Sequence, residues 1–307
     1  STGKLRRYLS GKNITDIARI NHGVTEAKNY MKEHKPDIVF SKGGFVAVPV
    51  VFAASRYNIP IVIHESDLSP GLANKLCYSR AAAICYNFPE TRSYLEKTRF
   101  AGKITQTGLP IRESLLNGSR EKGLQLCGFT GDKPVMLVIG GSLGSLNVNN
   151  AVRGALDGLL EQFRIIHICG RDKTDESLRG RGGYAQFEYV NEELKDLMAA
   201  ADIVISRAGA NVIWELEALK KPALLIPLGT AGSRGDQILN AESFEKQGFS
   251  AVLSEDDLTP ERLLSEVKAL YENREKYIYA MNEGGSIDAS YIIAGIISNL
   301  VKNRPQA

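Results

Sequence analysis

The sequence has no long apolar run and few of the residues that bind metals or form disulfides. Its longest apolar run, 46–54, contains Pro49, whereas a membrane-spanning helix needs about 20 apolar residues. We therefore expect no membrane-spanning segment. The cysteines and histidines show neither CxxC spacing nor any other metal-ligand pattern: His22, His34, His64, Cys77, Cys85, Cys127, His167 and Cys169. This pattern predicts a reducing compartment and no structural zinc.

Positive charge is concentrated in the first part of the chain. Residues 1–120 carry 18 Lys and Arg against 9 Asp and Glu, a net charge of +9, and the remainder carries 20 against 26, a net charge of −6. A basic half attracts nucleic acid, anionic lipid or a phosphorylated substrate, although an ordinary solvated surface explains the asymmetry equally well. Because no aromatic stacking platform or recognition helix accompanies the basic residues, we expect no nucleic-acid partner.

Short apolar runs, glycine-bearing turns and amphipathic stretches alternate along the chain. The first cycle runs from a strand predicted over 37–40 through Gly43 and Gly44 to a helix predicted over 49–57. Strands that are apolar on both faces and alternate with helices predict a parallel sheet covered on both sides. The polar, turn-rich segment 118–133 is the expected domain boundary, after which the cycle begins again. We therefore expect an α/β fold with two doubly wound domains that face a cleft.

A glycine-rich turn, GGSLGS at 140–145, follows a predicted strand and opens a predicted helix. Glycines let backbone N–H groups approach an anion, and a helix N-terminus adds partial positive charge, so this turn is a candidate phosphate cradle. Any tight strand-to-helix turn also favours glycine, and that alternative stays open. The spacing differs from GxGxxG and from the lysine-bearing P-loop, so it supports neither a nicotinamide site nor a kinase-type site.

Glu215 lies on a largely apolar predicted helix, six residues after Gly209. We expect Gly209 to permit a tight turn at the start of this helix. A carboxylate just under two helical turns further on can accept both hydroxyls of a ribose. The alternative is a solvated helix face, since Glu217 lies on the same helix.

Two further strand ends carry polar side chains that packing alone would not require. At the next strand-to-helix junction Asp236, Gln237 and Asn240 suit sugar hydroxyls, although Asp236 is also a good N-cap. In the first half the segment 64–75 begins with His64, for which a hydrogen-bonded structural histidine is the alternative.

In order, these segments resemble the MurG family, the bacterial N-acetylglucosaminyltransferases of peptidoglycan synthesis. The resemblance covers nearly the whole chain and is carried by KPDIVFSKGGFVAVPVV, HESDLSPGLANK, TGLPIRESLL, VIGGSLGS, ADIVISRAGANVIWELEALKKPALLIPL and DQILNAESFEKQG. It implies the GT-B architecture, with Rossmann-like domains over 1–120, for the acceptor and membrane side, and 121–284, for the UDP-sugar. A helix over 285–307 returns to the first domain.

The resemblance also implies a reaction and its partners. N-acetylglucosamine passes from UDP-N-acetylglucosamine, with inversion, to an undecaprenyl-diphosphate-linked acceptor, lipid I, to give lipid II. The implied location is the cytoplasmic face of the bacterial cell membrane, where the protein would be peripheral. No cofactor is implied, and because no DxD-like pair lies beside the glycine-rich turn, we expect metal-independent release of UDP.

The resemblance assigns site residues to the two substrates. The implied donor contacts are Glu215 for the ribose hydroxyls, Gly141 and Ser142 for the diphosphate, Arg112 on the nucleotide side, Tyr189 and Val190 at the uracil, and Asp236 and Gln237 at the sugar hydroxyls. The implied acceptor contacts are Gly43, Gly44, Asp67 and Asn74. His64 and Glu65 are the candidates for the catalytic base within this chain.

The chain departs from the family pattern at two points. Ser66 and Asp67 replace an amide pair where the family usually has H-E-Q-N. The family also begins with a glycine-rich loop bearing a histidine, ahead of the point that corresponds to Ser1, and that loop contributes to the acceptor diphosphate site and to the base. We therefore expect either a fragment or a homologue that binds donor without turnover.

The first twenty residues suit a membrane surface. Basic residues precede three isoleucines spaced by three: Lys4, Arg6, Arg7 and Lys12, then Ile14, Ile17 and Ile20. This spacing predicts one helix face, which could lie on an anionic membrane or pack on the first domain.

Three other functions stay open. A UDP-N-acetylglucosamine 2-epimerase and a glycolipid synthase acting on diacylglycerol would share this architecture. A non-catalytic UDP-sugar-binding homologue is the third.

Overall fold

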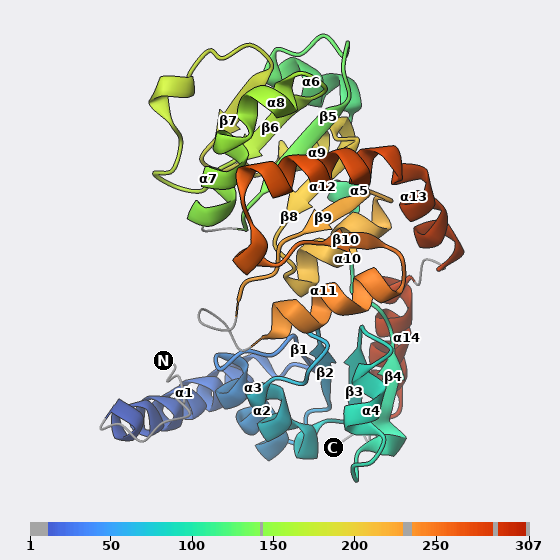
Figure 1. The fold of residues 1–307 in the computed structure, drawn as a ribbon. Coiled ribbons are helices and arrows are strands. Elements are labelled where there is room, and N and C mark those ends of the chain that lie inside the picture. Colours follow the sequence, from blue (N-terminus) through green and yellow to red (C-terminus); the bar gives the residue numbers. More distant parts are fainter. Residues whose placement is uncertain (1–11, 142–143, 230–234, 285–287, 305–307) are drawn as a thin grey trace. The chain divides into compact units, whose positions relative to one another are not determined.

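The structure is a computed structural model that describes residues 12–141, 144–229, 235–284 and 288–304, with side chains from residue 22 onward. The chain forms two compact units, residues 1–110 with 287–307 (unit 1) and residues 111–286 (unit 2). Figure 1 shows both units. The basic residues and isoleucines of the first twenty positions lie outside the described side chains.

Unit 1 contains a parallel sheet in the order β1-β2-β3-β4. Its strands are β1 (Val39–Ser41), β2 (Ile61–Glu65), β3 (Ala83–Tyr86) and β4 (Ile104–Gln106). Its helices are α1 (Lys12–His34), α2 (Ala47–Arg56), α3 (Leu72–Cys77), α4 (Thr91–Leu95) and α14 (Ala289–Lys302), with 3-10 turns η1 (Tyr78–Arg80) and η2 (Ala101–Lys103). The first strand thus begins two residues later than the predicted 37–40.

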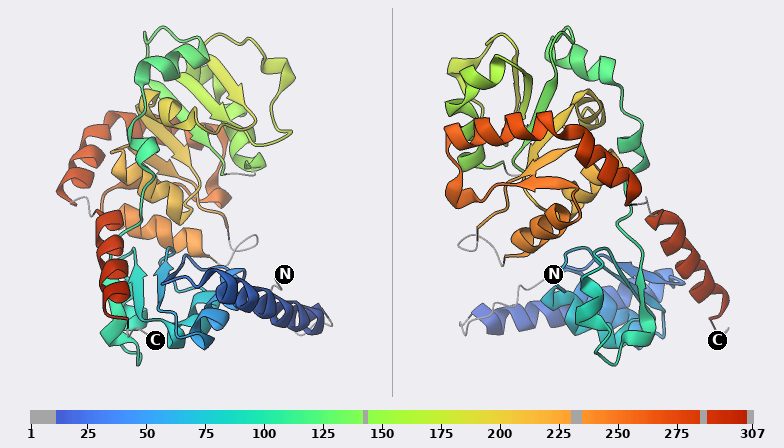
Figure 2. Two further views of the ribbon diagram at one scale, coloured as in Figure 1. Left: turned by 180° about the vertical axis from the view of Figure 1, so that it is seen from behind. Right: turned by 45° about the vertical axis from the view of Figure 1, so that its right-hand side comes forward.

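Side chains alternate between the two faces of the unit 1 sheet, as the pleat of a strand requires. Ile61 and Ile63 of β2 belong to the core beneath α1, α2 and α3. Val62 lies in the opposite cluster, where Ile293 of α14 is buried against it. Helices therefore cover both faces, and Figure 2 shows α14 beside the strands of unit 1.

Unit 2 contains a parallel sheet in the order β10-β9-β8-β5-β6-β7. Its strands are β5 (Val135–Ile139), β6 (Arg164–Ile168), β7 (Tyr184–Phe187), β8 (Ile203–Ser206), β9 (Ala223–Leu225) and β10 (Ser250–Val252). Its helices are α5 (Glu113–Leu116), α6 (Arg120–Cys127), α7 (Leu146–Gly154), α8 (Leu156–Leu160), α9 (Leu194–Ala200), α10 (Ala210–Ala218), α11 (Asp236–Lys246), α12 (Pro260–Glu272) and α13 (Arg274–Glu283), with 3-10 turns η3 (Glu176–Leu178) and η4 (Glu255–Asp257).

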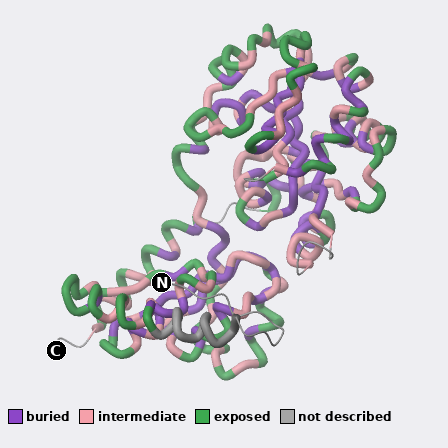
Figure 3. The backbone as a smooth tube through the Cα atoms, turned by 90° about the vertical axis from the view of Figure 1, so that its left-hand side faces the viewer, coloured by how far each residue is buried: buried purple, intermediate pink, exposed green. Residues whose placement is uncertain are grey.

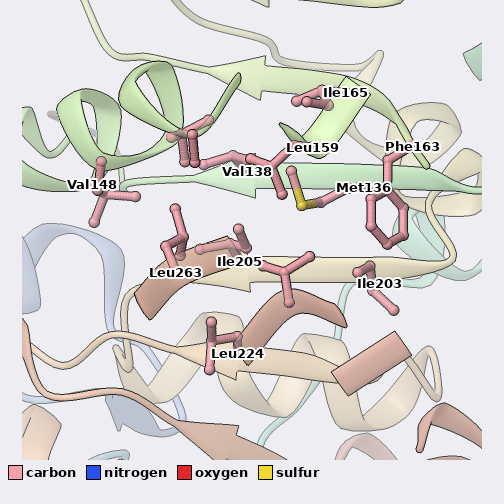
Figure 4. Close-up of a cluster of buried hydrophobic side chains, with 14 of the residues drawn as sticks. Met136, Val138, Val148, Leu159, Phe163, Ile165, Ile203, Ile205, Leu224 and Leu263 are labelled. Carbon is pink, nitrogen blue, oxygen red and sulfur yellow. The ribbon is translucent and has the colours of Figure 1, made fainter. Parts of the chain in front are cut away.

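The core of unit 2 is apolar on the central strands. Met136 and Val138 of β5 point into the same cluster as Ile205 of β8, and α7, α8 and α12 close this face (Figure 4). The residues of β5 and β8 in this cluster are buried, and Figure 3 shows buried residues, in purple, gathered in the interior of the unit. Strands buried on both faces are the reason that β5 reads as a continuous apolar run.

The predicted boundary segment, 118–133, contains a helix of unit 2. α6 packs on α9 so closely that a Cβ at Gly118 or Gly123 would lie 2.0 or 2.1 Å from a carbonyl oxygen of α9. Ser119 donates its backbone N–H to Asp196 Oδ1 at 2.7 Å. Close contact between the two helices therefore ties the residues after Gly118 to unit 2.

Candidate functional site

The strand order of unit 2 reverses near the centre of the sheet, and this is where open parallel sheets usually bind ligands. Strand order reverses between β5 and β8, because β6 and β7 lie on one side of β5 while β8, β9 and β10 lie on the other. In open parallel sheets, ligands bind at the carboxyl ends of the strands beside such a reversal. The glycine-rich turn follows β5 and α10 follows β8, so both predicted elements lie at this point.

The glycine-rich turn leaves one backbone edge open. Gly141 has φ +87°, and a Cβ built on it would meet nothing within 4 Å. Gly140 and Gly144 need glycine for packing, since their Cβ atoms would lie 2.4 Å from Ser145 N and 2.0 Å from Cys169 O. Tight-turn packing therefore explains two of these glycines, and the open side of Gly141 fits the approach of an anion. Ser142 lies outside the described residues.

Ser145 ends the turn as the N-cap of α7. Its hydroxyl accepts the backbone N–H of Val148. The free N–H groups and the dipole of this helix N-terminus favour a negative charge in front of it.

Glu215 is the sixth residue of α10 and is largely covered, with 16% of its side chain exposed. Arg112 Nη2 lies 3.4 Å from Glu215 Oε1, so the structure brings together two residues that the resemblance assigns to the nucleotide. Gly209 is the N-cap of α10 with φ −69° and no close neighbour to a Cβ. Neither the backbone conformation nor the packing at this position requires glycine, because any residue can adopt this conformation.

The remaining donor candidates occupy two other strand ends of unit 2. Tyr189, 68% exposed, and the half-buried Val190 follow the edge strand β7. Asp236 is the first residue of α11, whose N-cap is Gly235, so the N-cap alternative for Asp236 is wrong. Gln237 accepts the backbone N–H of Leu228 at 3.0 Å through Oε1.

Asn240 is fully buried in α11. Its Nδ2 donates to Ala208 O at 3.2 Å. This bond fixes α11 to the segment after β8.

In unit 1, the acceptor candidates Gly43 and Asn74 meet beside Glu65. Gly43 has φ +86°, and its Cβ would lie 2.9 Å from Asn74 Oδ1. Asn74 Nδ2 donates to Glu65 Oε2 at 2.9 Å, and the same oxygen accepts Gly71 N–H and Tyr78 O–H, each at 3.0 Å. Gly44 has φ +79° with open space around it. The two glycines therefore form a left-handed turn, and the first of them packs directly on the Asn74 amide.

The electrostatics of Glu65 follow from its burial. Burial raises its pKa, and the three hydrogen bonds, from Asn74 first, partly offset that rise. The negative charge of Asp67, which is half-buried, raises it further. Glu65 is therefore a buried carboxylate that holds three neighbouring groups through one oxygen.

His64 is completely buried in β2. Its Nε2 lies 2.9 Å from Gly108 O, and Ser66 Oγ lies 3.4 Å from its Nδ1. Burial lowers the pKa of His64 to about 4, so the ring is neutral and Nε2–H donates to the carbonyl. This geometry supports the structural alternative for His64, and the catalytic assignment of His64 and Glu65 stays a prediction.

Arg207 and Glu255 form a largely covered ion pair in unit 2 that no sequence pattern indicates. Each residue follows a strand, the usual signal for a site residue, but neither has a neighbour in sequence that suggests its partner. Within the described ranges, no group of three His, Cys, Asp or Glu side chains could hold a metal ion.

Sequence comparisons identify the family. The profile of the Glycosyltransferase family 28 C-terminal domain matches residues 135–293, and that of the family's N-terminal domain matches residues 1–86. A Lachnospira eligens protein is 54% identical over 303 residues, covering 99% of this chain and 83% of its own length. A Clostridium botulinum protein is 56% identical over 283 residues, covering 92% and 79%. Both are named UDP-N-acetylglucosamine–N-acetylmuramyl-(pentapeptide) pyrophosphoryl-undecaprenol N-acetylglucosamine transferase. The chain belongs to the MurG family.

Solved structures agree with the fold of this MurG-family chain. MurG of Acinetobacter baumannii superposes with a TM-score of 0.68 at 24% identity, covering 92% of this chain and 79% of that one. The UDP-GlcNAc 2-epimerase of Neisseria meningitidis bound to UDP-GlcNAc gives 0.67 at 15% identity, covering 96% and 84%. The predicted α/β class, with two parallel-sheet domains of GT-B type, is confirmed.

Proposed function

We propose that the protein transfers N-acetylglucosamine from UDP-N-acetylglucosamine to the undecaprenyl-diphosphate-linked muramoyl-pentapeptide, lipid I, to form lipid II. The observation that carries this proposal is identity of 54–56% to relatives named for that transfer, over 92–99% of the chain. A UDP site is further supported by the glycine-rich turn after β5 and by the helix of Glu215 after the neighbouring strand β8, at the strand reversal of unit 2.

The proposed donor contacts combine the family resemblance with the positions of these residues at the strand ends of unit 2. Glu215 accepts the ribose hydroxyls, while the open backbone at Gly141, with Ser142, binds the diphosphate. Arg112 lies on the nucleotide side, Tyr189 and Val190 border the uracil, and Asp236 and Gln237 bind the transferred sugar. As UDP leaves, charge grows on the diphosphate, and the N–H groups at the start of α7 stabilise it.

Unit 1 supplies the acceptor contacts. The left-handed turn of Gly43 and Gly44 leaves open space at Gly44, where an anionic diphosphate can approach the backbone, while the Gly43 N–H donates to Ser41 Oγ at 3.3 Å. Asn74 packs on this turn and is held by Glu65 Oε2 and by the carbonyl of His64, and Asp67 lies in the same segment. Attack of the acceptor hydroxyl on the anomeric carbon displaces UDP with inversion, and a base takes the hydroxyl proton.

The protein would act at the cytoplasmic face of the membrane as a peripheral protein. Among the described residues, no helix has the length and apolar character needed to cross a bilayer. The +9 net charge of residues 1–120 would favour anionic lipid by about 1 kcal/mol for each basic residue near the surface. Sedimentation with vesicles containing phosphatidylglycerol, compared with phosphatidylcholine vesicles, tests this location.

A radiolabelled-sugar assay tests the transfer. With a lipid I analogue, label from UDP-N-acetylglucosamine should appear in the lipid product with equimolar release of UDP, and EDTA should not change the rate. Conversion of UDP-N-acetylglucosamine in the absence of any acceptor would favour the 2-epimerase. Transfer of the label to diacylglycerol would favour the glycolipid synthase. Donor binding without transfer would favour a non-catalytic homologue.

A further inference from the structure

A single guanidinium joins the segments that follow three neighbouring strands of unit 2. Arg207 follows β8, and its Nη2 donates to Ser145 Oγ, in the turn after β5, at 2.7 Å. Its Nη1 donates to Ile226 O at 3.1 Å and to Pro227 O at 3.3 Å, both after β9. The side chain is 10% exposed, so these bonds are made largely out of solvent.

Glu255, which follows β10, completes the network. Its Oε1 accepts from Arg207 and from Asn147 Nδ2 of α7, the latter at 3.0 Å, and its Oε2 accepts Gly229 N–H at 3.2 Å. Burial alone would raise its pKa, but the bonds from Arg207, Gly229 and Asn147 together lower it. Glu255 is therefore a charged carboxylate that holds four consecutive strand ends, since the sheet order is β10-β9-β8-β5.

The hydrogen bonds of Arg207 and Glu255 reach both segments that the proposed donor site requires, the diphosphate turn and the segment that binds the sugar. Ser145, held by Arg207, caps α7 directly after the glycine-rich turn. Gly229, held by Glu255, is next to Leu228, whose N–H donates to the side chain of Gln237. The diphosphate segment and the sugar segment thus share one charged support, which touches neither Glu215 nor the segment of Tyr189 in any described contact.

We propose that Glu255 is a positioning residue for the UDP-sugar donor, fixing the diphosphate turn and Gln237 relative to each other through Arg207, Asn147 and Gly229. The inference rests on the proposed function, because it requires that unit 2 binds this donor. Glu255 does not contact the donor in this proposal. It keeps the hydrogen-bonding groups in the one arrangement that fits both diphosphate and sugar.

Two substitutions test the proposal. Glu255→Ala removes the carboxylate and leaves Arg207 without its counter-ion, whereas Glu255→Gln keeps an oxygen for hydrogen bonding and removes the charge. Glu266→Gln is the matched control, since Glu266 is also paired with an arginine, Arg262, in unit 2. Thermal unfolding of each variant shows whether unit 2 remains folded.

Binding of two ligands gives the decisive readout. Glu255→Ala should weaken UDP-N-acetylglucosamine binding at least tenfold by calorimetry, with Glu255→Gln intermediate and Glu266→Gln unchanged. Uridine binding, followed by ligand-observed NMR, should change less than twofold, because uridine reaches neither supported segment.

Two results would overturn the proposal. One is unchanged UDP-sugar affinity in a folded Glu255→Ala variant, and the other is an equal loss of uridine and UDP-sugar binding, which indicates general damage to the fold. If the unsubstituted chain bound neither ligand, the proposed function itself would fail, and this inference with it.

Discussion

Arg112 and Glu215 form an ion pair within unit 2, with Nη2 and Oε1 3.4 Å apart, although they are 103 residues apart in sequence. Arg112 is 63% exposed and Glu215 16%. Such an exposed pair contributes little to folding, about 0–1 kcal/mol. In the proposed function the pair brings a cation and a carboxylate to one place, where the phosphates of a nucleotide would bind the cation and its ribose hydroxyls the carboxylate.

Replacing Glu215 should weaken donor binding while leaving the fold intact. Hydrogen bonds to a charged group contribute about 1.5–3 kcal/mol, so Glu215→Ala should raise the Kd of UDP roughly 10- to 100-fold. Isothermal calorimetry with UDP measures the effect. Glu217→Gln, on the same helix but paired with Lys220, is the control that should bind UDP normally. An unchanged Kd in Glu215→Ala would contradict the ribose assignment.

The ion pair between Arg112 and Glu215 should contribute little to the free energy of unfolding. Arg112→Ala should lower the free energy of unfolding by less than about 1 kcal/mol, because the pair is exposed. It should nevertheless weaken UDP binding about tenfold through loss of a charge-assisted contact to phosphate. A double-mutant cycle with Glu215→Gln, measured once by urea unfolding and once by UDP titration, separates the two effects. A large stability effect without a binding effect would show a structural role only.

Gly43 and Gly44 offer a matched comparison in unit 1. Both have positive φ, so Gly44→Ala should cost about 1–2 kcal/mol from backbone strain alone. Gly43→Ala should cost about 1–3 kcal/mol more, because its Cβ would displace the Asn74 amide from the buried carboxylate of Glu65. Urea unfolding monitored for unit 1 measures the difference. Equal losses for the two variants would contradict the close approach to Asn74.

Acid should destabilise unit 1 through His64. The unfolded chain binds a proton near pH 6.5, but in the folded state the pKa is about 4. Between these values the unfolded state holds more protons, so stability falls as the pH drops from about 6.5 to 4, by about 3 kcal/mol in total.

His64→Gln isolates this effect, because a glutamine amide can still donate to Gly108 O but does not titrate. The variant should lose part of the stability at neutral pH and show a flatter profile between pH 6.5 and 4 in urea unfolding. His34→Gln, at an exposed residue of α1, should keep the parental profile. If the stability of His64→Gln fell with pH as steeply as that of the parent protein, the acid sensitivity would come from another group.

Local sequence predicted the structure correctly wherever the pattern depends on one strand and the turn that follows it. The apolar run of β5 predicts a strand buried on both faces, and the glycines at 140–144 predict the turn after it. Glu215 is notable because a carboxylate on a largely apolar helix needs a polar partner or a ligand. The same reasoning did not show that the backbone at Gly209 is one that any residue can adopt, and it could not choose between a catalytic and a structural His64.

The sequence by itself determined the alternation of strands and helices, and with it the parallel sheets, because hydrophobic periodicity is a local property that each segment carries alone. Only the tertiary structure decided which strand ends are neighbours. The order β10-β9-β8-β5 brings Arg207 to Glu255 and Ser145, and the order β2-β3-β4 brings the carbonyl of Gly108 to His64. These partners lie 44 to 62 residues apart in sequence. Their charged and hydrogen-bonding groups interact only because the sheet places them within about 3 Å of each other.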